Sequence, residues 1–558
     1  MFDIAKDKDL WKRVRENSEF SQHRKELKEL YEKAFVNEPR PHSADEILEN
    51  NDGGLWRLQF DQLQSSALLS LIYPENEEYY HNLKKIVWAY LNEYAWGPIG
   101  HFSEYYYGKT PADFDCGLID IFAASVGFAL AEIKNLFSDR FPKLLKDRIS
   151  YEIKRHIIEP YITRRFFWEK HDNNWTAVCT GAVGSVLIYE APELYYAYRE
   201  RLHRSIKCYL DSYKDDGMCV EGVGYWTFGF GFFACFALLE KELTKGEVNW
   251  FEDKKVREVS KFQQKTFLQR DVIITYSDSS VKQSYFFGVP HMLRYVYGEE
   301  IEPLPKEMGL VVYDNTHFNF ALRSIVFYSE DNIATKIRTN ATYGSDSSCY
   351  FVKRTENYGF SCKGGNNGES HNHLDVGTFI LARNNKQIIC DIGAGPYEEG
   401  YHTNKRYTFF HPSSFAHNLP IINGLGQSDI AVDDAFCIYD KEKEAVTIEI
   451  GPAYRLDYLK SLQRHFDFED NKITLTDAYD LLGENEIKER FVSLIEPKIV
   501  DGVVKIEDVT LKSSNGTLPV IEAKEVKAHM GNIGKHNVYL IDYTLNKGEN
   551  KFKLEITM

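Results

Sequence analysis

The chain has 558 residues, of which 43% are hydrophobic and 27% are charged, so it is long enough for two large domains of ordinary globular composition. Its formal net charge of -16 provides no general basic field, which argues against nucleic acid as a partner. No apolar run approaches the ~18 residues of a membrane-spanning helix, so no membrane partner is expected.

The first part of the chain is predicted to be helical. Apolar side chains recur at three- and four-residue spacing, and turn signals such as Pro192-Glu193 separate the segments. Successive helical pairs of this kind indicate stacked or circular α-hairpins. The predicted helices are residues 117–136, 145–158, 175–190, 194–212 and 224–242.

The pattern changes near residues 305–320, beyond which the chain reads as short strands divided by Asn, Asp, Gly and Lys turns. Strands in a run after helices in a run favour an α+β protein of two domains, which we place at residues 1–310 and 311–558. No nucleotide-binding glycine motif follows a strand. The predicted strands are residues 377–382, 387–392, 445–450, 472–478, 537–544 and 551–557.

The cysteines and the N-terminal residues bear on the compartment. Nine cysteines are scattered without a CxxC pair, which disfavours a thiolate zinc site and fits free thiols in a reducing environment. The N-terminal segment has no basic stretch followed by an apolar one, so a signal peptide is not predicted. We therefore expect a cytoplasmic protein.

The densest polar cluster lies in residues 363–375. His371 and His373 are two residues apart, a spacing that points both imidazoles to one face of a strand. Asp391 lies at the end of a predicted strand, and His417 comes further along the chain. Two histidines and an aspartate form an N/O metal set that suits zinc or manganese. The competing interpretation is a hydrogen-bonded polar cluster between strands.

These residues carry a resemblance to a known family. The β-rich half resembles the signature of the heparinase II/III-like β-domain, and two helical segments resemble that family's Asn-Trp and Gly-Tyr-Trp segments. The order and separation of the segments also agree, so the resemblance spans most of the chain. The matching segments are His371-Asn-His373-Leu-Asp375-Val-Gly377-Thr-Phe379, Asp391-Ile-Gly393, Tyr397, His417-Asn418, Asn173-Asn174-Trp175 and Glu221-Gly-Val-Gly-Tyr225-Trp226-Thr-Phe228-Gly229.

The resemblance implies an N-terminal incomplete (α/α) toroid followed by a C-terminal antiparallel β-sandwich, with a cleft between them. It also implies a divalent metal, zinc or manganese, held by His373, Asp391 and His417. The implied activity is a polysaccharide lyase that cleaves uronic-acid-containing glycans by β-elimination. Its substrate would be an anionic oligosaccharide or polysaccharide of the hyaluronan, chondroitin or heparan type.

β-Elimination removes the proton at C5 of a uronate, stabilises the enolate-like carboxylate and protonates the oxygen that leaves C4. A near-neutral base suits His371, and an acid that holds its proton suits Tyr225. Donors to the developing carboxylate charge suit His171 and Asn174. These four residues are the predicted catalytic set, and Asn173, Trp226, Arg406, Tyr397 and Glu369 are predicted to bind substrate. Where some relatives carry a second tyrosine this chain has Phe228, so we place the phenol on Tyr225.

Other interpretations stay open. Tyr225 and Trp226 lie in an aromatic run that could be core, and Asn173 or Asn174 could cap the following helix. Tyr105, Tyr106 and Tyr107 could stack on sugar rings. For the whole chain, the alternatives are an alginate or oligoalginate lyase of the same fold, a uronate C5-epimerase, and a glycan-binding protein without activity. The sequence does not predict the oligomeric state.

Overall fold

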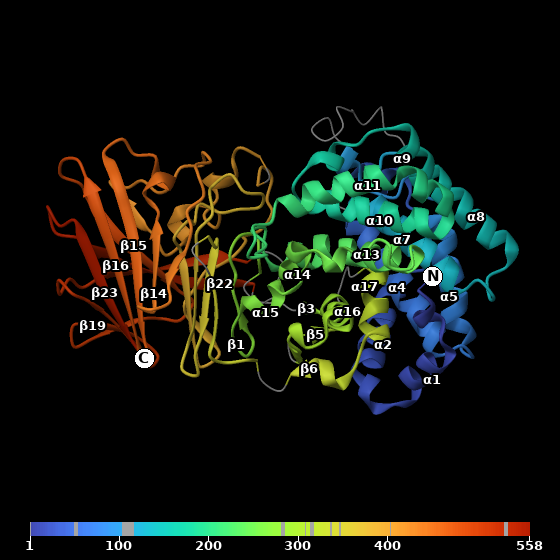
Figure 1. Cartoon of the computed structure of the whole chain (residues 1–558), viewed down its shortest axis with the longest axis horizontal. Helices are drawn as coiled ribbons and strands as arrows, with labels where there is room; N and C mark the ends of the chain where they lie inside the picture. Colours follow the sequence, from blue (N-terminus) through green and yellow to red (C-terminus); the bar gives the residue numbers. More distant parts are fainter. Residues whose placement is uncertain are drawn as a thin grey trace. The chain divides into compact units, whose positions relative to one another are not determined.

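The computed structural model divides the chain into two compact units, each of which is described by itself (Figure 1). Unit 1 comprises Met1–Ser212, Trp226–Val256 and Ser284–Ala334, and unit 2 comprises Tyr213–Tyr225, Arg257–Gln283 and Thr335–Met558. The predicted linear boundary at residue 310 differs from this division, because two segments from the helical part of the chain belong to unit 2. The structure describes residues 2–49, 54–102, 117–280, 285–306, 309–312, 317–334, 337–344, 347–401, 403–528 and 534–558.

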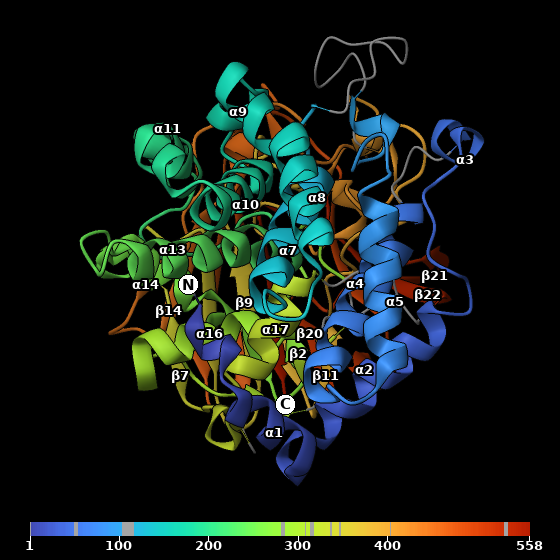
Figure 2. The same ribbon diagram turned by 90° about the vertical axis from the view of Figure 1, so that its right-hand side faces the viewer.

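Unit 1 is built from helices, several of which face the viewer in Figure 2. Its main described helices are α1 (Lys8–Glu16), α2 (Ser21–Ala34), α3 (Ala44–Glu49), α4 (Gly54–Ile72), α5 (Glu77–Tyr90), α7 (Ile121–Leu136), α8 (Lys143–Ile153), α9 (Glu159–Thr163), α10 (Asn174–Glu190), α11 (Pro192–Asp211), α13 (Gly231–Leu243), α16 (Gly288–Tyr297) and α17 (Phe318–Val326).

Helix α10 is the core helix of unit 1. It is apolar on all sides, which is the pattern of a helix buried among others, and it packs against α7, α11 and α13. A side chain at Gly181 would meet the backbone oxygen of Phe232 at 2.7 Å, so glycine is required where α10 approaches α13.

Two predicted helices contain a π-helical turn, η5 (Lys154–Ile158) and η7 (Trp226–Phe230). Such turns often mark functional sites, and η7 begins directly after Tyr225. The stretch Val223–Leu243 is apolar and long enough to cross a membrane, so the prediction that no apolar run approaches this length is wrong. Its most apolar window is 78% buried, as in a core helix.

The described residues of unit 2 form three antiparallel sheets of four or more strands, besides the two-stranded hairpin β1-β2. Their strand orders are β11-β10-β9-β8-β7, β12-β17-β22-β21 and β13-β14-β15-β16-β23-β20-β19-β18. The strands are β7 (Ala341–Tyr343), β8 (Tyr350–Arg354), β9 (Gly359–Lys363), β10 (Phe379–Arg383), β11 (Lys386–Ile389), β12 (Pro420–Ile422), β13 (Ile438–Asp440), β14 (Ala445–Glu449), β15 (Leu459–Glu469), β16 (Lys472–Leu481), β17 (Ile487–Ser493), β18 (Lys498–Val500), β19 (Val503–Ile506), β20 (Val509–Ser513), β21 (Val520–Lys527), β22 (Lys535–Thr544) and β23 (Lys551–Thr557).

Phenylalanine rings join the three sheets in one core. The fully buried ring of Phe379 on β10 lies 5.2 Å from Phe466 on β15 and 6.0 Å from Phe491 on β17, measured between ring centroids. Each of these strands belongs to a different sheet. A short hairpin, β1 (Phe267–Gln269) and β2 (Val272–Ile273), packs on this part of unit 2. The rigid core therefore supports the loops that leave β2, β9 and β11.

Candidate active site

A buried carboxylate organises a group of polar side chains within unit 2. Asp278 follows β2, and its Oδ2 lies 3.0 Å from His371 Nδ1 while its Oδ1 lies 3.1 Å from His373 Nε2. Oδ1 also accepts hydrogen bonds from the Tyr401 hydroxyl at 3.0 Å and from the Arg406 guanidinium at 2.7 Å. One carboxylate therefore orients two imidazoles, a phenol and a guanidinium.

Asp278 is held in its ionised form. Burial alone would raise the pKa of this carboxyl, but hydrogen bonds from His371 and His373 and the positive charge of Arg406 hold the pKa well below its usual range. An ionised carboxylate only accepts hydrogen bonds, so each imidazole must donate the proton that faces it. His371 therefore carries its proton on Nδ1, and in its neutral form the lone pair is on Nε2.

The imidazole of His371 stacks on the ring of Tyr225, with 4.0 Å between centroids and 23° between planes. Tyr225 ends the short helix α12 (Val223–Tyr225), and its hydroxyl lies 3.3 Å from that of Tyr397. Burial and the negative charge of Asp278 both raise the pKa of Tyr225 well above its usual range. The phenol thus keeps its proton at neutral pH beside an imidazole that has a basic nitrogen.

The prediction that His371 and His373 share one face of a strand is wrong. Both lie in the loop between β9 and β10, where Gly365 and Gly377 also adopt positive φ. His371 has a left-handed backbone with φ of 57°, which is uncommon for a residue with a Cβ. The two imidazoles converge because this turn directs both of them to Asp278.

A second group of donors lies beside the first. His373, Asp391 and His417 are all buried, and one potential ligand atom from each lies within 4.8 Å of the others. Asp391 follows β11, close to the predicted strand end, and its Oδ2 is 2.8 Å from His417 Nδ1. Burial opposes ionisation of both groups, yet their mutual attraction raises the pKa of His417 and lowers that of Asp391.

These donors fit a divalent cation of the zinc type. His373 Nδ1 and His417 Nε2 are buried and have no hydrogen-bond partner among the described residues. Buried polar atoms are normally satisfied, so two unsatisfied imidazole nitrogens beside a carboxylate indicate a missing partner. Asp278 also binds the far nitrogen of His373, which is the usual way in which a metal-binding imidazole is oriented.

The predicted residues of unit 1 lie around the start of α10. Asn173 is the N-cap of this helix, since its Oδ1 accepts a hydrogen bond from the Trp175 amide at 3.2 Å. Asn174 is buried at the first helical position, and His171 is exposed with its ring 5.5 Å from that of Phe167. The helix-capping alternative thus describes Asn173, while His171 and Asn174 belong to one helix start.

Two other predicted contacts have a structural explanation. Trp226 is fully buried and stacks on Phe230, so its ring is core of unit 1 and the substrate-binding prediction for it is not supported. Arg406 is buried and donates to Asp278 and to the backbone oxygens of His371 and Asn372, so these contacts explain its place, and its role in substrate binding stays a prediction. The predicted contacts of Tyr105, Tyr106 and Tyr107 lie outside the described residues.

Glu369 lies at the entrance to the loop that carries His371. It is half-buried, and burial is the main cause that raises its pKa to about 7. The charges of Asp375 and Asp434 add to this effect, while that of Lys363 opposes it. Its predicted role in substrate binding stays a prediction.

Asp278 is the residue of this site that the sequence did not reveal. Asp278 lies 93 residues before His371, in the segment Ser277-Asp278-Ser279-Ser280. No motif or spacing marks this segment, and only the packing of the β1–β2 hairpin on unit 2 brings it to the histidines. Tyr225 was expected to come from the helical domain, but it belongs to unit 2 together with His371.

The chain was compared with known protein families, sequences and structures. No protein-family model and no curated protein sequence matches the chain. Among solved structures, a heparinase III has 13% identity and a TM-score of 0.62, with 96% of this chain and 84% of that chain covered. The heparan sulfate lyase of Pedobacter heparinus has 12% identity and a TM-score of 0.57, covering 99% and 92%. The chondroitin AC lyase of Streptomyces coelicolor has 8% identity and a TM-score of 0.56, covering 99% and 82%.

The chain has the fold of the heparinase III and chondroitin AC lyases. The predicted class is therefore confirmed: a helical toroid-type part precedes a C-terminal antiparallel β-sheet part. At 8 to 13% identity the likeness establishes the fold, and the chemistry has to be argued from the residues of this chain.

Proposed function

We propose that this protein is a polysaccharide lyase that cleaves uronate-containing glycans by β-elimination. The single observation that supports this most is the stacked pair of His371 and Tyr225 beside the ionised Asp278. This pair provides a basic nitrogen and a protonated phenol within one small volume. The fold shared with glycosaminoglycan lyases makes an anionic polysaccharide the natural substrate class.

In the proposed reaction, His371 Nε2 takes the proton from C5 of the uronate. The electron pair left on C5 forms the C4–C5 double bond as the C4–O bond breaks. The hydroxyl of Tyr225 donates its proton to the leaving oxygen, and Tyr397 receives or supplies a hydrogen bond at the phenol. Asp278 stabilises the imidazolium of His371 without itself taking the proton.

The negative charge that develops on the uronate carboxylate needs preorganised donors. We assign this role to Asn174 and His171 at the start of α10, as the residue types suggest. Because Asn173 already serves as the N-cap, it acts here by fixing the helix start rather than by contacting substrate. Kinetic measurements on variants of these residues test the assignment.

We further propose that His373, Asp391 and His417 hold one divalent ion, zinc or manganese, with a structural role. When bound, the ion would neutralise the buried carboxylate and fix the loop that carries His371. Elemental analysis of the purified protein should find about one equivalent of metal. Chelation should lower the thermal unfolding temperature, because binding energy at such a site is also folding energy.

His417→Ala should abolish this metal content and the response to chelator. His465→Ala, which alters a partly exposed histidine on β15, is the matched control and should change neither. Metal content that stays far below one equivalent after incubation with zinc or manganese would contradict the proposal.

The activity test follows ultraviolet absorbance during incubation with hyaluronan, chondroitin, heparan sulfate and alginate oligosaccharides. A lyase creates the C4–C5 double bond of an unsaturated uronate, which absorbs, whereas hydrolysis does not. An increase with one glycan class identifies the substrate. If the absorbance does not increase with any of these glycans and the masses of the oligosaccharides stay unchanged, the proposed activity is refuted.

The same assay separates the remaining alternatives. An alginate or oligoalginate lyase would give the absorbance increase with alginate alone. A uronate C5-epimerase would give none, but would exchange the C5 hydrogen with solvent deuterium. A binding protein would do neither. His371 as a proton acceptor and Tyr225 as a proton donor favour the lyase over the binding protein.

A further inference from the structure

The outer side of the loop that carries Arg406 and His417 forms a surface hollow of about 520 Å³ within unit 2. Its wall consists of Tyr407, Phe410 and Phe415, and its floor is one face of the β12-β17-β22-β21 sheet. A volume of this size falls in the range of small-molecule sites. None of the predicted catalytic or substrate-binding residues lines it.

The sheet face under the hollow presents charge. Glu522 and Lys524 are two residues apart on β21, so both point to the same face, where Leu540 of β22 is paired with Glu522. The Lys524 ammonium lies 4.8 Å from the centroid of the Phe410 ring. Among the ion pairs of the described residues, none involves Lys524. Its charge is thus available to an anion.

The wall is built firmly. Arg490 on β17 makes a two-point pair with Asp542, with nitrogen–oxygen distances of 2.8 and 2.7 Å, and donates to the backbone oxygen of Phe415 at 3.0 Å. This contact holds the main chain at Phe415, a residue that is 38% exposed. An exposed aromatic residue on a main chain that a partly buried ion pair fixes is a preformed platform for a ligand.

We propose that this hollow is a second glycan-binding site, which takes a segment of an anionic sugar chain. Ring faces of Phe415 and Tyr407 suit the C–H faces of pyranoses, Lys524 suits a carboxylate or sulfate, and Glu522 suits sugar hydroxyls. The proposal rests on the proposed function for its ligand class. The proposed second site is separate from the candidate active site, because Asp278 and its partners do not line the hollow.

The hollow and the candidate active site share one hydrogen bond. The hydroxyl of Tyr407 donates to Asn372 Oδ1 at 2.6 Å, and Asn372 lies between His371 and His373. A sugar chain in the hollow would therefore contact a residue that supports the catalytic loop. For this reason Tyr407 is not a suitable test position, whereas Lys524 and Phe415 have no such link.

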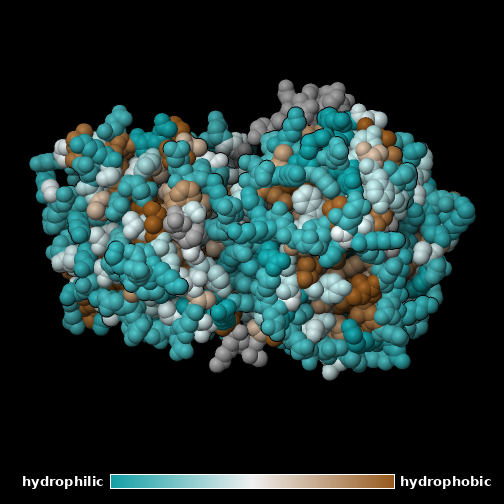
Figure 3. Space-filling view, viewed as in Figure 1, coloured by the Kyte–Doolittle hydropathy of each residue, from teal (hydrophilic) through white to brown (hydrophobic). Residues whose placement is uncertain are grey.

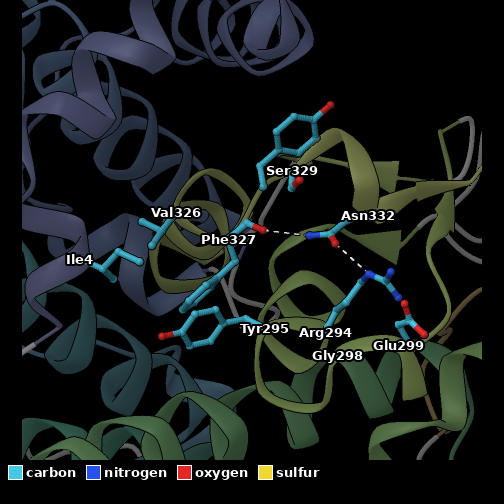
Figure 4. Close-up of a pocket in the computed structure, with 10 residues that line it drawn as sticks. Ile4, Arg294, Tyr295, Gly298, Glu299, Val326, Phe327, Ser329 and Asn332 are labelled. Atoms are coloured by element: carbon cyan, nitrogen blue, oxygen red, sulfur yellow. Dashed lines mark hydrogen bonds between the residues drawn. The ribbon is translucent and has the colours of Figure 1, made fainter.

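A cavity in unit 1 also has aromatic and cationic residues in its lining, but its cation differs from Lys524 in having hydrogen-bond partners. That cavity, of about 360 Å³, is lined by Tyr295 and Phe327, and Figure 4 shows Arg294 directed to Asn332. The Arg294 Nε donates to Asn332 Oδ1 at 2.8 Å, and the same guanidinium also donates to the Ile301 backbone oxygen. The guanidinium of Arg294 is thus already hydrogen-bonded. On the face that Figure 3 shows, hydrophobic residues gather in several places over unit 1.

The test measures amide hydrogen exchange of the full-length Tyr225→Phe protein with hexasaccharides of unsulfated chondroitin and of mannuronate. Tyr225→Phe prevents consumption of the probe. Protection is expected in residues 407–416 and 520–527 in addition to the loop 364–378. The variant with both Lys524→Ala and Phe415→Ala should lose protection in 407–416 and 520–527 and keep it in 364–378. Its binding of the hexasaccharide at the hollow should be about tenfold weaker.

Lys527→Ala is the matched control, since Lys527 lies on the same strand but points to the opposite face, and it should leave all protection unchanged. Absence of protection in 407–416 and 520–527 with either probe overturns the proposal, and so does protection that survives the double substitution. A separate result would reject the proposed lyase function, namely that the wild-type protein forms no unsaturated product. Protection at the hollow without such a product would retain the second site and reject the lyase.

Discussion

Both units bury charged groups, but the two networks differ in their access to solvent. In unit 1, Arg323 of α17 forms a two-point pair with Glu132 of α7, and neither side chain is exposed. In unit 2, Asp278 is equally buried, but its partner His371 keeps 21% of its side chain exposed. The first network connects two helices, whereas the second connects a buried charge to a partly exposed imidazole.

This difference in exposure distinguishes buried charges that stabilise the fold from those that could take part in a reaction. A pair that connects two helices should matter for stability and not for turnover. A group at the solvent end of a network should matter for turnover and little for stability. The following predictions test this comparison.

Tyr225→Phe should produce the largest effect at the site. It keeps the ring that stacks on His371 and removes only the oxygen that transfers the proton. Turnover should fall by ~10²–10⁴-fold, as is typical for loss of a general acid or base, while the lost contact with the Tyr397 hydroxyl should cost no more than about 1 kcal/mol of stability. The measurement is the initial rate of unsaturated product formation.

The control for Tyr225→Phe is Tyr454→Phe. The Tyr454 hydroxyl is buried in the core of unit 2 and donates to the Pro420 backbone oxygen at 2.7 Å. Its loss should cost about 1 kcal/mol of stability without a change in turnover. If Tyr225→Phe keeps near-normal turnover, the phenol assignment is wrong and Tyr397 or Tyr401 becomes the candidate.

Arg323→Met should produce the corresponding effect on the network that connects α7 and α17. It leaves Glu132 buried without its guanidinium, which should lower the stability of unit 1 by about 3–5 kcal/mol. Hydrogen exchange of α7 and α17 during denaturant titration measures this loss. Lys143→Met is the control, because the Lys143–Asp147 pair is exposed and should be worth less than ~1 kcal/mol. Equal effects of the two variants would contradict the comparison.

Asn174→Ala tests whether the start of α10 contributes to the reaction. Loss of one preorganised donor to the carboxylate should slow turnover by ~10²–10³-fold. Asn173→Ala is the matched control at the neighbouring residue. It removes the N-cap and should cost about 1 kcal/mol of stability with a small effect on turnover. The reverse result would assign the substrate contact to Asn173.

Glu369→Gln should have the smallest effect, and its sign depends on pH. The unfolded chain loses this proton near 4.5, whereas burial raises the folded pKa to about 7. Between these values the folded state binds more protons than the unfolded state, so the contribution of Glu369 to stability falls as pH rises. Relative to wild type, the variant should gain about 2–3 kcal/mol between pH ~4.5 and ~7. A constant difference in unfolding free energy across this range would show that the carboxyl is not buried in solution.

Much of the fold follows from periodicity in the sequence. The helices of α7, α10 and α11 were predicted within a few residues because their apolar positions recur at helical spacing over long segments. The strands β10, β14 and β23 were predicted because β-branched and aromatic residues stand between clear turn signals. Local chemistry decides both cases, so a single sequence contains the information.

The site was only partly predictable. His373, Asp391 and His417 lie together as the family resemblance implied, but no local signal marks His417 or distinguishes His373 from His371. Asp278 was missed because its role depends on a contact with residues 93 positions away. Trp226 was misjudged because an aromatic run looks the same in a core and at a binding surface. The left-handed turn at His371 was also missed, since no glycine marks it.

The discontinuity of unit 2 has a consequence for how the protein is synthesised. Residues 213–225 and 257–283 leave the ribosome before the strands on which they pack, and β1 must wait for β9. The fit is close, since a Cβ on Gly359 would meet the Leu268 backbone oxygen at 2.2 Å. The nascent chain therefore displays apolar hairpin surface until its C-terminal part emerges, which is a period of aggregation risk. A shortened gene that starts at residue 311 would encode the sheets without Tyr225 and Asp278.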